Sequence, residues 1–464
     1  MYKKTDPKIV KRLIDIAGSE NVFSLPGDLE AYAKDETPGA YYLPEAVVRP
    51  NDPGQVKEIL KMANFSNIPL VPRGGGTGLS GGALAVNGGI VLTFENLNKI
   101  KDIDNKNRMA IVEPGVINGI FQEEAAKIGL FYPVNPASMD SCTMGGNVAE
   151  STGGANTVRF GTTRNYITGI KAVTGSCEEW TAGGKIVKNS TDQTLIQLMC
   201  GSEGILSIFT ELYFRLISLP SYTSWIIAPF KDIYKIPEAA LKIVNENIDP
   251  TMIELMDSST LELCSSHLGK DIQHKEYHQL MVRFDSNDPR LIEDACVKTG
   301  ELCASEGAID VLVADSKREQ EKLWEIRSAI HEAIVNQNQS VCEEDVVVPV
   351  ACITSLIDNI YRIADDKGFK AVIFGHLGDG NIHLNFLNQN NRKDNIEEDI
   401  EILREEVFKT AVDLGGKLSG EHGIGISKKK YFKKYIHPNY INLLKAVKKQ
   451  FDPNNILNPG KIID

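Results

Sequence analysis

The sequence predicts an α+β protein built from two different domains, and three observations lead to that prediction. The first half of the chain carries short apolar runs separated by glycine-rich loops, with helical periodicity mainly at 53–66 and 117–129. From about residue 223 the pattern changes to strands that alternate with long helices. In addition, 464 residues are too many for one hydrophobic core.

The predicted domain limits follow this change of pattern. We expect one domain at 1–222 and a second at 223–430, in which helices cover one face of a largely antiparallel sheet. The remaining segment, 431–464, contains an amphipathic helix, YINLLKAVKKQF, and then the turn-rich FDPNNILNPGK. We expect this C-terminal segment to pack back on the body of the protein.

Charge and composition exclude several classes of function. The net charge of −12 argues against a nucleic-acid surface and against a polybasic membrane anchor. The chain has no apolar run of about eighteen residues, and its start, MYKKTDPKIVKRL, scatters its charges, so we expect no transmembrane segment and a cytoplasmic location. Its eight cysteines form no C-x-x-C pair, which supports neither a zinc ribbon nor a cysteine-ligated iron–sulfur cluster.

In the first domain, a glycine-rich loop lies between two predicted strands. Its sequence, PRGGGTGLSGG at 72–82, contains G-x-G-x-x-G. A Rossmann fingerprint requires a helix directly after the last glycine. Here only four residues separate Gly82 from Asn87-Gly88-Gly89, a hairpin signal, whereas a crossover helix needs about ten residues or more. The predicted strands of this domain are 68–74, 88–94, 109–115, 166–175 and 205–217.

The glycine loop is therefore predicted to bind a phosphate through its backbone amides, since residues without a Cβ let the main chain approach an anion. The alternative is a mobile glycine linker. The residues predicted to bind the ligand here are Arg73, Gly74, Gly75, Gly76, Thr77, Gly78 and Ser80.

A second glycine series, MGGNVAESTGGANTVRFGTT at 144–163, follows NPAS at 135–138. Two separated loops suit a ligand with an extended body. The residues predicted to line this part of the site are Pro136, Ser138, Gly145, Gly146, Asn147, Ser151, Gly153 and Gly154.

With both loops described, the first 220 residues resemble the FAD-binding domain of the vanillyl-alcohol-oxidase type, which binds FAD in an elongated pose with the pyrophosphate on such a loop. GSEGILSIFTELYFRL at 201–216 is similar to the closing motif of that domain. NPGK at 458–461 is similar to the terminal segment that returns to the flavin, which adds Asn458 to the expected contacts. Residues 1–266 contain no histidine, and neither Cys142 nor Cys177 lies in the first glycine loop, so we expect noncovalent FAD.

The second half begins with strand-like runs at 252–256, 279–284 and 308–314, with helices expected from Asp288 and Ser316. Further strand-like runs, DVVVPV and KAVIFGH, flank the helical stretch TSLIDNIYRIADD. These elements form the predicted α+β substrate (cap) domain.

Two short stretches of this domain concentrate polar residues. GHLGDGNIHLNF holds His376, Asp379, Asn381, His383 and Asn385, and EHGIG adds Glu421 and His422. A glycine turn between two strands can bring both imidazoles to one point. Two imidazoles and one carboxylate, with coordination positions left open, form a divalent-metal site of the catalytic type for Zn²⁺ or Fe²⁺. The alternative is a set of polar turn residues with ordinary hydrogen bonds.

GHLGDGNIH and SGEHGIG resemble the signatures of FAD-linked 2-hydroxy-acid dehydrogenases, the group that includes D-lactate, glycolate and D-2-hydroxyglutarate dehydrogenases. The resemblance implies that His376, His383 and Glu421 bind the metal, that Asn385 contacts substrate, and that His422 is the catalytic base. In KLWEIRSAI, the related arginine meets the substrate carboxylate, which implies that role for Arg327. Without the resemblance, Arg327 reads as a surface salt-bridge partner.

The expected reaction is oxidation of a small 2-hydroxy acid, with the metal on its hydroxyl and the flavin facing it as hydride acceptor. Relatives that oxidise D-2-hydroxyglutarate carry a basic residue before D-V-x-x-P, where this chain has Glu343 and Glu344, and two acids there repel a second carboxylate. We therefore expect D-lactate as substrate, ahead of glycolate. The expected electron acceptor is a partner protein, either electron-transferring flavoprotein or an iron–sulfur subunit.

Two other functions stay open on the sequence alone. One is an NAD-dependent Rossmann dehydrogenase, which the missing helix after Gly82 opposes. The other is a flavin-binding electron carrier without enzymatic activity, which the clusters of histidine and glutamate oppose.

Overall fold

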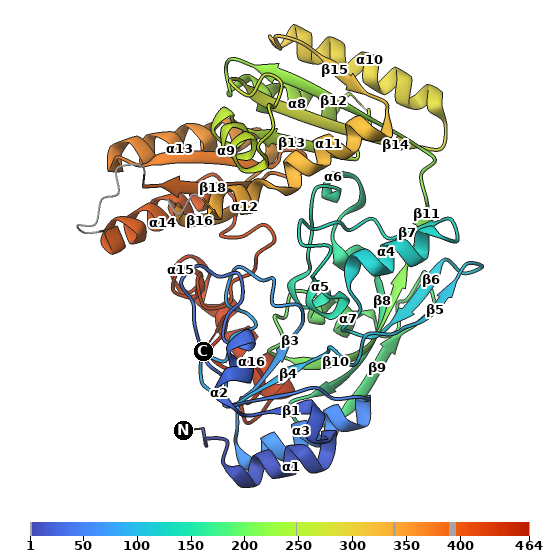
Figure 1. Ribbon diagram of the computed structural model, residues 1–464, viewed down its shortest axis with the longest axis vertical. Coiled ribbons are helices and arrows are strands. Elements are labelled where there is room, and N and C mark those ends of the chain that lie inside the picture. The colour runs from blue at the N-terminus through green and yellow to red at the C-terminus, as the bar shows by residue number, and fades with distance from the viewer. Residues whose placement is uncertain (1, 247, 337–339, 389–395, 464) are drawn as a thin grey trace. The chain divides into compact units, whose positions relative to one another are not determined.

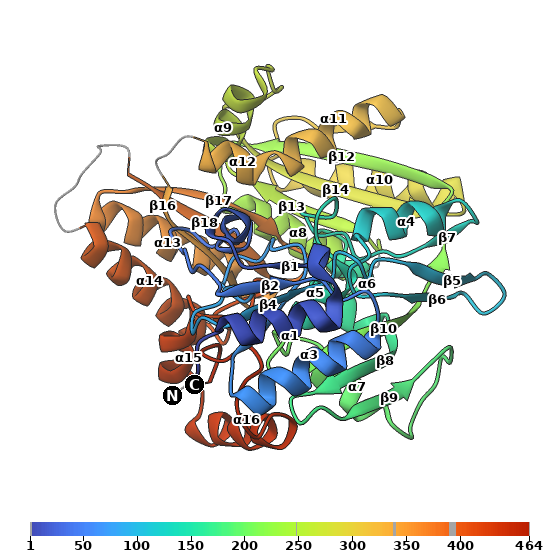
Figure 2. The same cartoon turned by 60° about the horizontal axis from the view of Figure 1, so that its bottom comes forward.

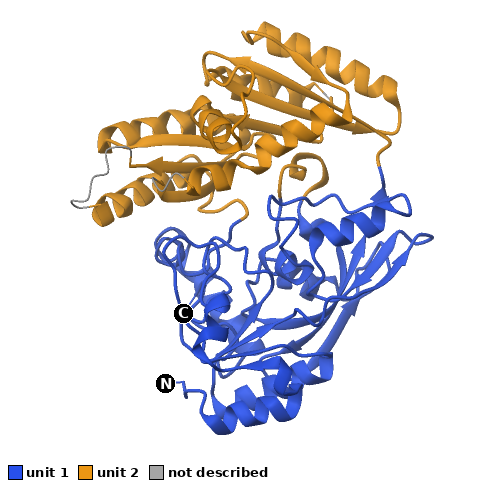
Figure 3. Ribbon diagram, viewed as in Figure 1, with its two compact units in different colours: residues 1–153, 162–219, 422–464 blue, residues 154–161, 220–421 orange. Residues whose placement is uncertain are grey.

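The computed structural model describes residues 2–246, 248–336, 340–388 and 396–463. The chain divides into two compact units (Figure 3). Unit 1 comprises residues 1–153, 162–219 and 422–464, and unit 2 comprises 154–161 and 220–421. The domain limits that we predicted lie near two of these changeovers, at 219/220 and 421/422. The sequence did not indicate that 154–161 leaves unit 1 within the second glycine series.

Unit 1 contains a four-stranded sheet whose buried face packs on two helices, α1 (Pro7–Ala17) and α3 (Pro53–Ser66). Helix α3 begins after Asp52, whose carboxylate accepts the backbone N–H of Gln55, and ends at Asn67 in the left-handed conformation. The sheet order is β1 (Val22–Phe23), β2 (Ala46–Val48), β4 (Ile90–Thr93) and β3 (Leu70–Arg73).

The hairpin predicted at Asn87-Gly88-Gly89 is wrong, because β3 and β4 are parallel. Gly88 and Gly89 both have positive φ, 68° and 82°. A Cβ on Gly89 would collide with the carbonyl of Pro69, so the turn packs against the start of β3. Strand β4 therefore starts level with β3 and runs in the same direction. The glycine loop and the residues after it return the chain to that end of the sheet.

The other large sheet of unit 1 is antiparallel and contains three of the predicted strands. The sheet order is β5 (Ile100–Asp104), β6 (Met109–Val112), β10 (Ser207–Arg215), β8 (Ile167–Thr174) and β9 (Glu179–Gly183).

Helix α5 (Met144–Glu150) lies in the second glycine series, where we expected only a loop. The helix forms because Thr143 caps it by accepting the N–H of Gly146, while Gly145 packs directly against Pro114.

The C-terminal segment belongs to unit 1 and consists of α15 (Lys429–Tyr435), α16 (Pro438–Phe451) and a return to the first sheet. Leu457 pairs with Leu70 of β3. The buried ammonium of Lys448 donates to the Asp452 carboxylate at 2.5 Å and to the carbonyls of Ile205 and Leu457. These bonds fix the residues that precede Asn458.

Unit 2 is built on a seven-stranded sheet in which every neighbouring pair is antiparallel (Figure 1). Helices α10 (Pro289–Ser305) and α11 (Lys317–Ser328) begin after Asp288 and Ser316, as predicted, and each capping side chain accepts a backbone N–H. The order is β15 (Leu312–Ala314), β12 (Tyr222–Phe230), β14 (His278–Ser286), β13 (Met252–Met256), β17 (Lys370–His376), β18 (Asn381–Leu387) and β16 (Ser340–Val347).

Helices cover both faces of this sheet, so the expectation of a single covered face is wrong. Every residue of β13 and β18 is buried, although their side chains alternate between the two faces. On one face, Met252 and Met256 pack against α9 (Ser258–Leu268) and α12 (Ile330–Val335). Figure 2 shows α8 (Lys235–Asn245) and α13 (Ile353–Lys367) on the other face. Among the described residues, none of the helices combines the length and the apolar character needed to span a membrane.

Candidate functional site

The strand register of unit 2 gathers polar side chains on one face of its sheet. Glu254 of β13 lies opposite His376 of β17, and His376 lies opposite Asn381 of β18. One step along, Phe374 lies opposite His383. Because directly opposed residues of antiparallel strands point to the same face, all five side chains share it.

A tight turn joins the two strands that carry the histidines. Gly380 in this turn has a φ of 85°, and a Cβ there would collide with the carbonyl of Val348, so only glycine fits. The turn sets the β17–β18 register, and the register sets the positions of the two imidazole rings. The imidazole centroids of His376 and His383 lie 5.3 Å apart, with the rings nearly perpendicular.

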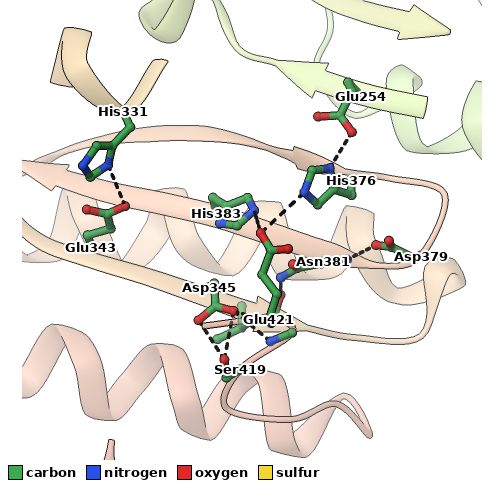
Figure 4. A network of polar contacts seen from close by, with 12 residues as sticks. Glu254, His331, Glu343, Asp345, His376, Asp379, Asn381, His383, Ser419 and Glu421 are labelled. Atoms are coloured by element: carbon green, nitrogen blue, oxygen red, sulfur yellow. Dashed lines mark hydrogen bonds and ion pairs between the residues drawn. The ribbon is translucent and has the colours of Figure 1, made fainter. Parts of the chain in front are cut away.

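Three ligand atoms of the predicted metal site converge (Figure 4). Glu421 Oε1 lies 3.7 Å from His376 Nε2 and 3.3 Å from His383 Nε2. Both histidines are buried. Burial raises the pKa of Glu421, but its hydrogen bonds to the two histidines outweigh that effect and hold the pKa well below its usual range. Two imidazole nitrogens and one ionised carboxylate fit Zn²⁺ or Fe²⁺ with positions left open.

A buried carboxylate, Glu254, joins this cluster to Arg327. Its Oε1 lies 2.5 Å from His376 Nδ1, and its Oε2 accepts Arg327 Nε at 2.6 Å. Burial raises the pKa of Glu254, but Arg327 and His376 outweigh it and bring the pKa to about 2. A carboxylate on Nδ1 leaves Nε2 as the metal ligand, which is the usual arrangement behind a metal-binding histidine.

Glu254 was missed at the sequence level, because MIELM was read only as a strand. The signal was available: one charged residue stands among four apolar residues in a run that is otherwise typical of a buried strand.

Arg327 is buried, so the alternative of a surface salt-bridge partner is wrong: its ion pair is with the buried Glu254. It lies one turn after Trp324 on α11 and is 7% exposed, with its guanidinium 5.6 Å from the ring centre of Phe374. Nε is bonded to Glu254. Within the described ranges, its two terminal amino groups donate no hydrogen bond. They remain able to bind a planar anion such as a carboxylate.

Asn385 presents a second donor on the same face. Its side-chain oxygen accepts from Ser340 Oγ at 2.8 Å. Its side-chain nitrogen is buried and finds no acceptor among the described residues. A buried donor without an acceptor is costly, and a ligand oxygen would remove that cost. This observation supports Asn385 as a substrate contact.

His422 follows Glu421 directly but belongs to unit 1, so the change from one unit to the other falls between the predicted ligand and the predicted base. Gly423 has a φ of 81°, which turns the chain immediately after His422. The catalytic role of His422 stays a prediction.

Unit 1 holds the predicted phosphate loop. Strand β3 ends at Arg73, and the described residues between β3 and β4 form no helix, which rules out a Rossmann unit here. Within the described part of the chain, the backbone N–H groups of residues 75–81 donate no hydrogen bond. A Cβ on Gly75 would collide with the carbonyl of Ser141, so the loop packs against the residues that precede α5.

The loop has the donors that a pyrophosphate requires. Arg73 is buried, and its Nη1 has no acceptor among the described residues. Free amides beside a buried guanidinium fit an anionic group. Gly76, Thr77, Gly78 and Ser80 lie in the same loop, and Gly74 packs against Thr143.

The other predicted cofactor residues occupy several local structures. Asn458 donates to the carbonyls of Gly82 and Glu203, both at 2.8 Å, and so ties the C-terminal segment to the end of the first loop. Gly153 lies in unit 1, whereas Gly154 lies in unit 2. Gly145, Gly146 and Asn147 lie in α5, Ser151 ends that helix with a φ of 57°, and the carbonyls of Pro136 and Ser138 accept backbone N–H groups.

The Glu254 contacts predict that Glu254→Gln weakens metal binding about 10- to 100-fold, because the amide holds the His376 ring less strongly. Titration of the chelator-treated protein with Zn²⁺, followed by calorimetry, measures the change. The matched control is Glu262→Gln, since Glu262 is an exposed glutamate of the same unit that lies 3.9 Å from Lys370. Equal affinities for Glu254→Gln and wild type would show that Glu254 does not support the metal site.

Two family models match the chain: the FAD binding domain over residues 44–183, and the C-terminal domain of FAD linked oxidases over residues 219–462. D-lactate dehydrogenase of Anaerostipes hadrus is 32% identical, covering 99% of this chain and 98% of that protein. Glycolate oxidase subunit GlcD of Bacillus subtilis is 32% identical over 98% and 96%. D-2-hydroxyglutarate dehydrogenase of Stutzerimonas stutzeri is 32% identical over 99% of both chains.

The fold recurs in solved structures at much lower identity. p-Cresol methylhydroxylase with bound substrate superposes with a TM-score of 0.81 at 17% identity, covering 98% of this chain and 96% of that one. This confirms the predicted vanillyl-alcohol-oxidase-type fold. The chain belongs to the family of FAD-linked oxidases, in the group of the FAD-linked 2-hydroxy-acid dehydrogenases, and is an FAD-dependent oxidoreductase.

Proposed function

We propose that this protein oxidises a small 2-hydroxy monocarboxylate, D-lactate foremost, to the 2-oxo acid. The observation that carries the proposal lies in unit 2, where three atoms able to bind a metal converge. On the same face of the sheet, the side-chain nitrogen of Asn385 has no acceptor among the described residues. Arg327 is tied to the same cluster through Glu254. A hydroxy acid presents the matching groups, a hydroxyl for a Lewis acid and a carboxylate for paired donors.

Each group of the chain has a defined task in this reaction. Bound at His376, His383 and Glu421, Zn²⁺ or Fe²⁺ would supply the Lewis acidity that makes the hydroxyl proton easier to remove, and FAD would supply the hydride acceptor. Arg327 and Asn385 hold the carboxylate and so orient C2. His422 accepts the hydroxyl proton, since an imidazole titrates near neutral pH. Loss of that proton and of a hydride from C2 amounts to a two-electron oxidation.

We propose that a partner protein accepts the electrons of this oxidation, either electron-transferring flavoprotein or an iron–sulfur subunit. Sequence similarity to a chain named as a subunit, GlcD, supports this. A flavin carrier without enzymatic activity is the second candidate, and the gathered ligands and donors of unit 2 argue against it.

Glu343 supports the proposal that the substrate carries only one carboxylate. We expected both Glu343 and Glu344 to face the substrate, but the strand corrects this, because neighbours on β16 point to opposite faces. Glu343 lies opposite Asn385, on the face of the sheet that also carries His376 and His383. Its Oε1 lies 3.5 Å from His331 Nδ1. Glu344 lies on the other face and accepts Arg404 Nε at 2.8 Å. One carboxylate beside Asn385 disfavours a substrate with a second carboxylate.

The experiment that tests the proposed function is an anaerobic titration followed by visible absorption. The purified protein should show flavin bands that D-lactate bleaches, glycolate bleaches more slowly, and L-lactate leaves unchanged. His422→Ala should keep its FAD and lose the bleaching. A yellow protein that no 2-hydroxy acid reduces would establish the carrier instead.

The position of Glu343 predicts a change of selectivity. Glu343→Lys should raise kcat/KM for D-2-hydroxyglutarate relative to D-lactate by about tenfold or more, because an attractive charge replaces a repulsive one near the distal carboxylate. Steady-state assays with an artificial electron acceptor measure the ratio. Glu344→Gln, on the opposite face of the same strand, is the control and should leave the ratio unchanged. An unchanged ratio in Glu343→Lys would remove Glu343 as the determinant.

A further inference from the structure

The segment Ser419–Gly425, SGEHGIG, carries both the predicted metal ligand and the predicted base, and the chain changes from unit 2 to unit 1 in its middle. Each side of the segment is bound by a carboxylate of its own unit. Neither carboxylate was singled out by the sequence.

On the unit 2 side, the carboxylate is that of Asp345, which is fully buried. Its Oδ2 accepts the backbone N–H of Gly420 at 2.9 Å and of Glu421 at 2.8 Å, and its two oxygens accept the Ser419 hydroxyl (Figure 4). Asp345 lies opposite His383 in the β16–β18 register. The strand pair that presents one metal ligand therefore also fixes the backbone of another.

On the unit 1 side, the carboxylate is that of Glu203, which is 6% exposed. Its two oxygens accept the backbone N–H groups of Ile424 and Gly425, each at 2.7 Å. A second acid, Glu150, lies beside it: a Cβ on Gly423 would stand 2.5 Å from Glu150 Oε2 and 2.9 Å from Glu203 Oε1. Both carboxyl groups therefore lie next to Gly423, the residue that follows His422.

Burial raises the pKa of both acids, and that of Glu150 more strongly. Glu150 is half-buried, and its buried Oε2 has no hydrogen-bond partner among the described residues. Burial and the neighbouring Glu203 raise its pKa well above the usual range, Asp35 adds to that effect, and Lys428 opposes it. Glu203 also faces Lys428 and Lys461. Of the two acids, Glu203 is the one whose oxygens both accept backbone N–H groups of the segment.

We propose that Asp345 and Glu203 are positioning residues that fix the two ends of Ser419–Gly425, and so set the directions of the Glu421 and His422 side chains. Charge-assisted hydrogen bonds to successive amides are strong and directional. The catalytic part of this inference rests on the roles proposed above for Glu421 and His422.

The chemistry of the two carboxylates predicts opposite responses to amide substitution. Asparagine at 345 can keep its oxygen on both backbone N–H groups and direct its amide nitrogen to Ser419 Oγ, so Asp345→Asn should retain the bonds that Asp345→Ala loses. At 203 the two N–H groups go to different oxygens, so the amide nitrogen of Glu203→Gln replaces one acceptor and leaves one N–H unpaired in the wild-type pose. Glu150→Gln, a neutral replacement in the same pair, is the matched control.

Hydrogen exchange of the FAD-loaded protein, read by mass spectrometry at residues 419–425, tests the contacts without measuring activity. We expect faster exchange at Ile424 and Gly425 in Glu203→Gln, and at Gly420 and Glu421 in Asp345→Ala. Asp345→Asn and Glu150→Gln should keep the wild-type pattern. If Glu203→Gln does not retain FAD, Gly423→Ala gives a second test, because its Cβ displaces both carboxyl groups. Wild-type exchange in Asp345→Ala and Glu203→Gln would overturn the inference.

The catalytic part has its own measurements. Glu203→Gln should reduce the rate constant of flavin reduction by D-lactate about tenfold or more, with Zn²⁺ affinity retained and KM little changed. Asp345→Ala should weaken Zn²⁺ binding by about tenfold. Faster hydrogen exchange in Glu203→Gln and Asp345→Ala, combined with a wild-type rate of flavin reduction and wild-type Zn²⁺ affinity, would overturn the positioning role. A wild-type flavin that no 2-hydroxy acid reduces would defeat the proposed function instead, while exchange and metal affinity still test the positioning role at Glu421.

Discussion

The arrangement of unit 2 depends on the buried charge of Glu254. An isolated carboxylate in such a place would cost several kcal/mol, so the charge persists only with Arg327 on one oxygen and His376 on the other. The same requirement fixes both partners: Nε2 of His376 turns towards Glu421, and the terminal amino groups of Arg327 donate no hydrogen bond within the described residues. In the proposed function, Glu254 would therefore link metal binding to carboxylate binding.

The sheet supplies the second constraint, because antiparallel register decides which residues share a face. Strands β13, β17, β18 and β16 place Glu254, His376, His383 and Asp345 in adjacent rows. The same alternation separates Glu343 from Glu344. p-Cresol methylhydroxylase shares the fold at 17% identity. A shared fold does not by itself fix the chemistry, which depends on the side chains of the site.

Local signals in the sequence predicted much of this structure. Helix caps at Asp288 and Ser316 were visible, and so was the His-x6-His spacing, because both depend on residues close in the chain. Glu254 escaped notice because its partner His376 is 122 positions away and only strand pairing joins them. The prediction of a hairpin at Gly88 was wrong for a related reason. A turn signal does not show whether the next strand pairs in parallel or antiparallel with the strand before it. Helix α5 was missed because its glycines serve close packing.

The most direct test of the account is the dependence of flavin reduction on the metal. Protein treated with a chelator should keep its FAD and its visible spectrum, yet be reduced by D-lactate at least about 100-fold more slowly in anaerobic stopped flow. Addition of Zn²⁺ or Fe²⁺ should restore the rate, with saturation at one ion per chain. Full-rate reduction by the metal-free protein would contradict the account, as would a tightly bound ion that leaves the rate unchanged.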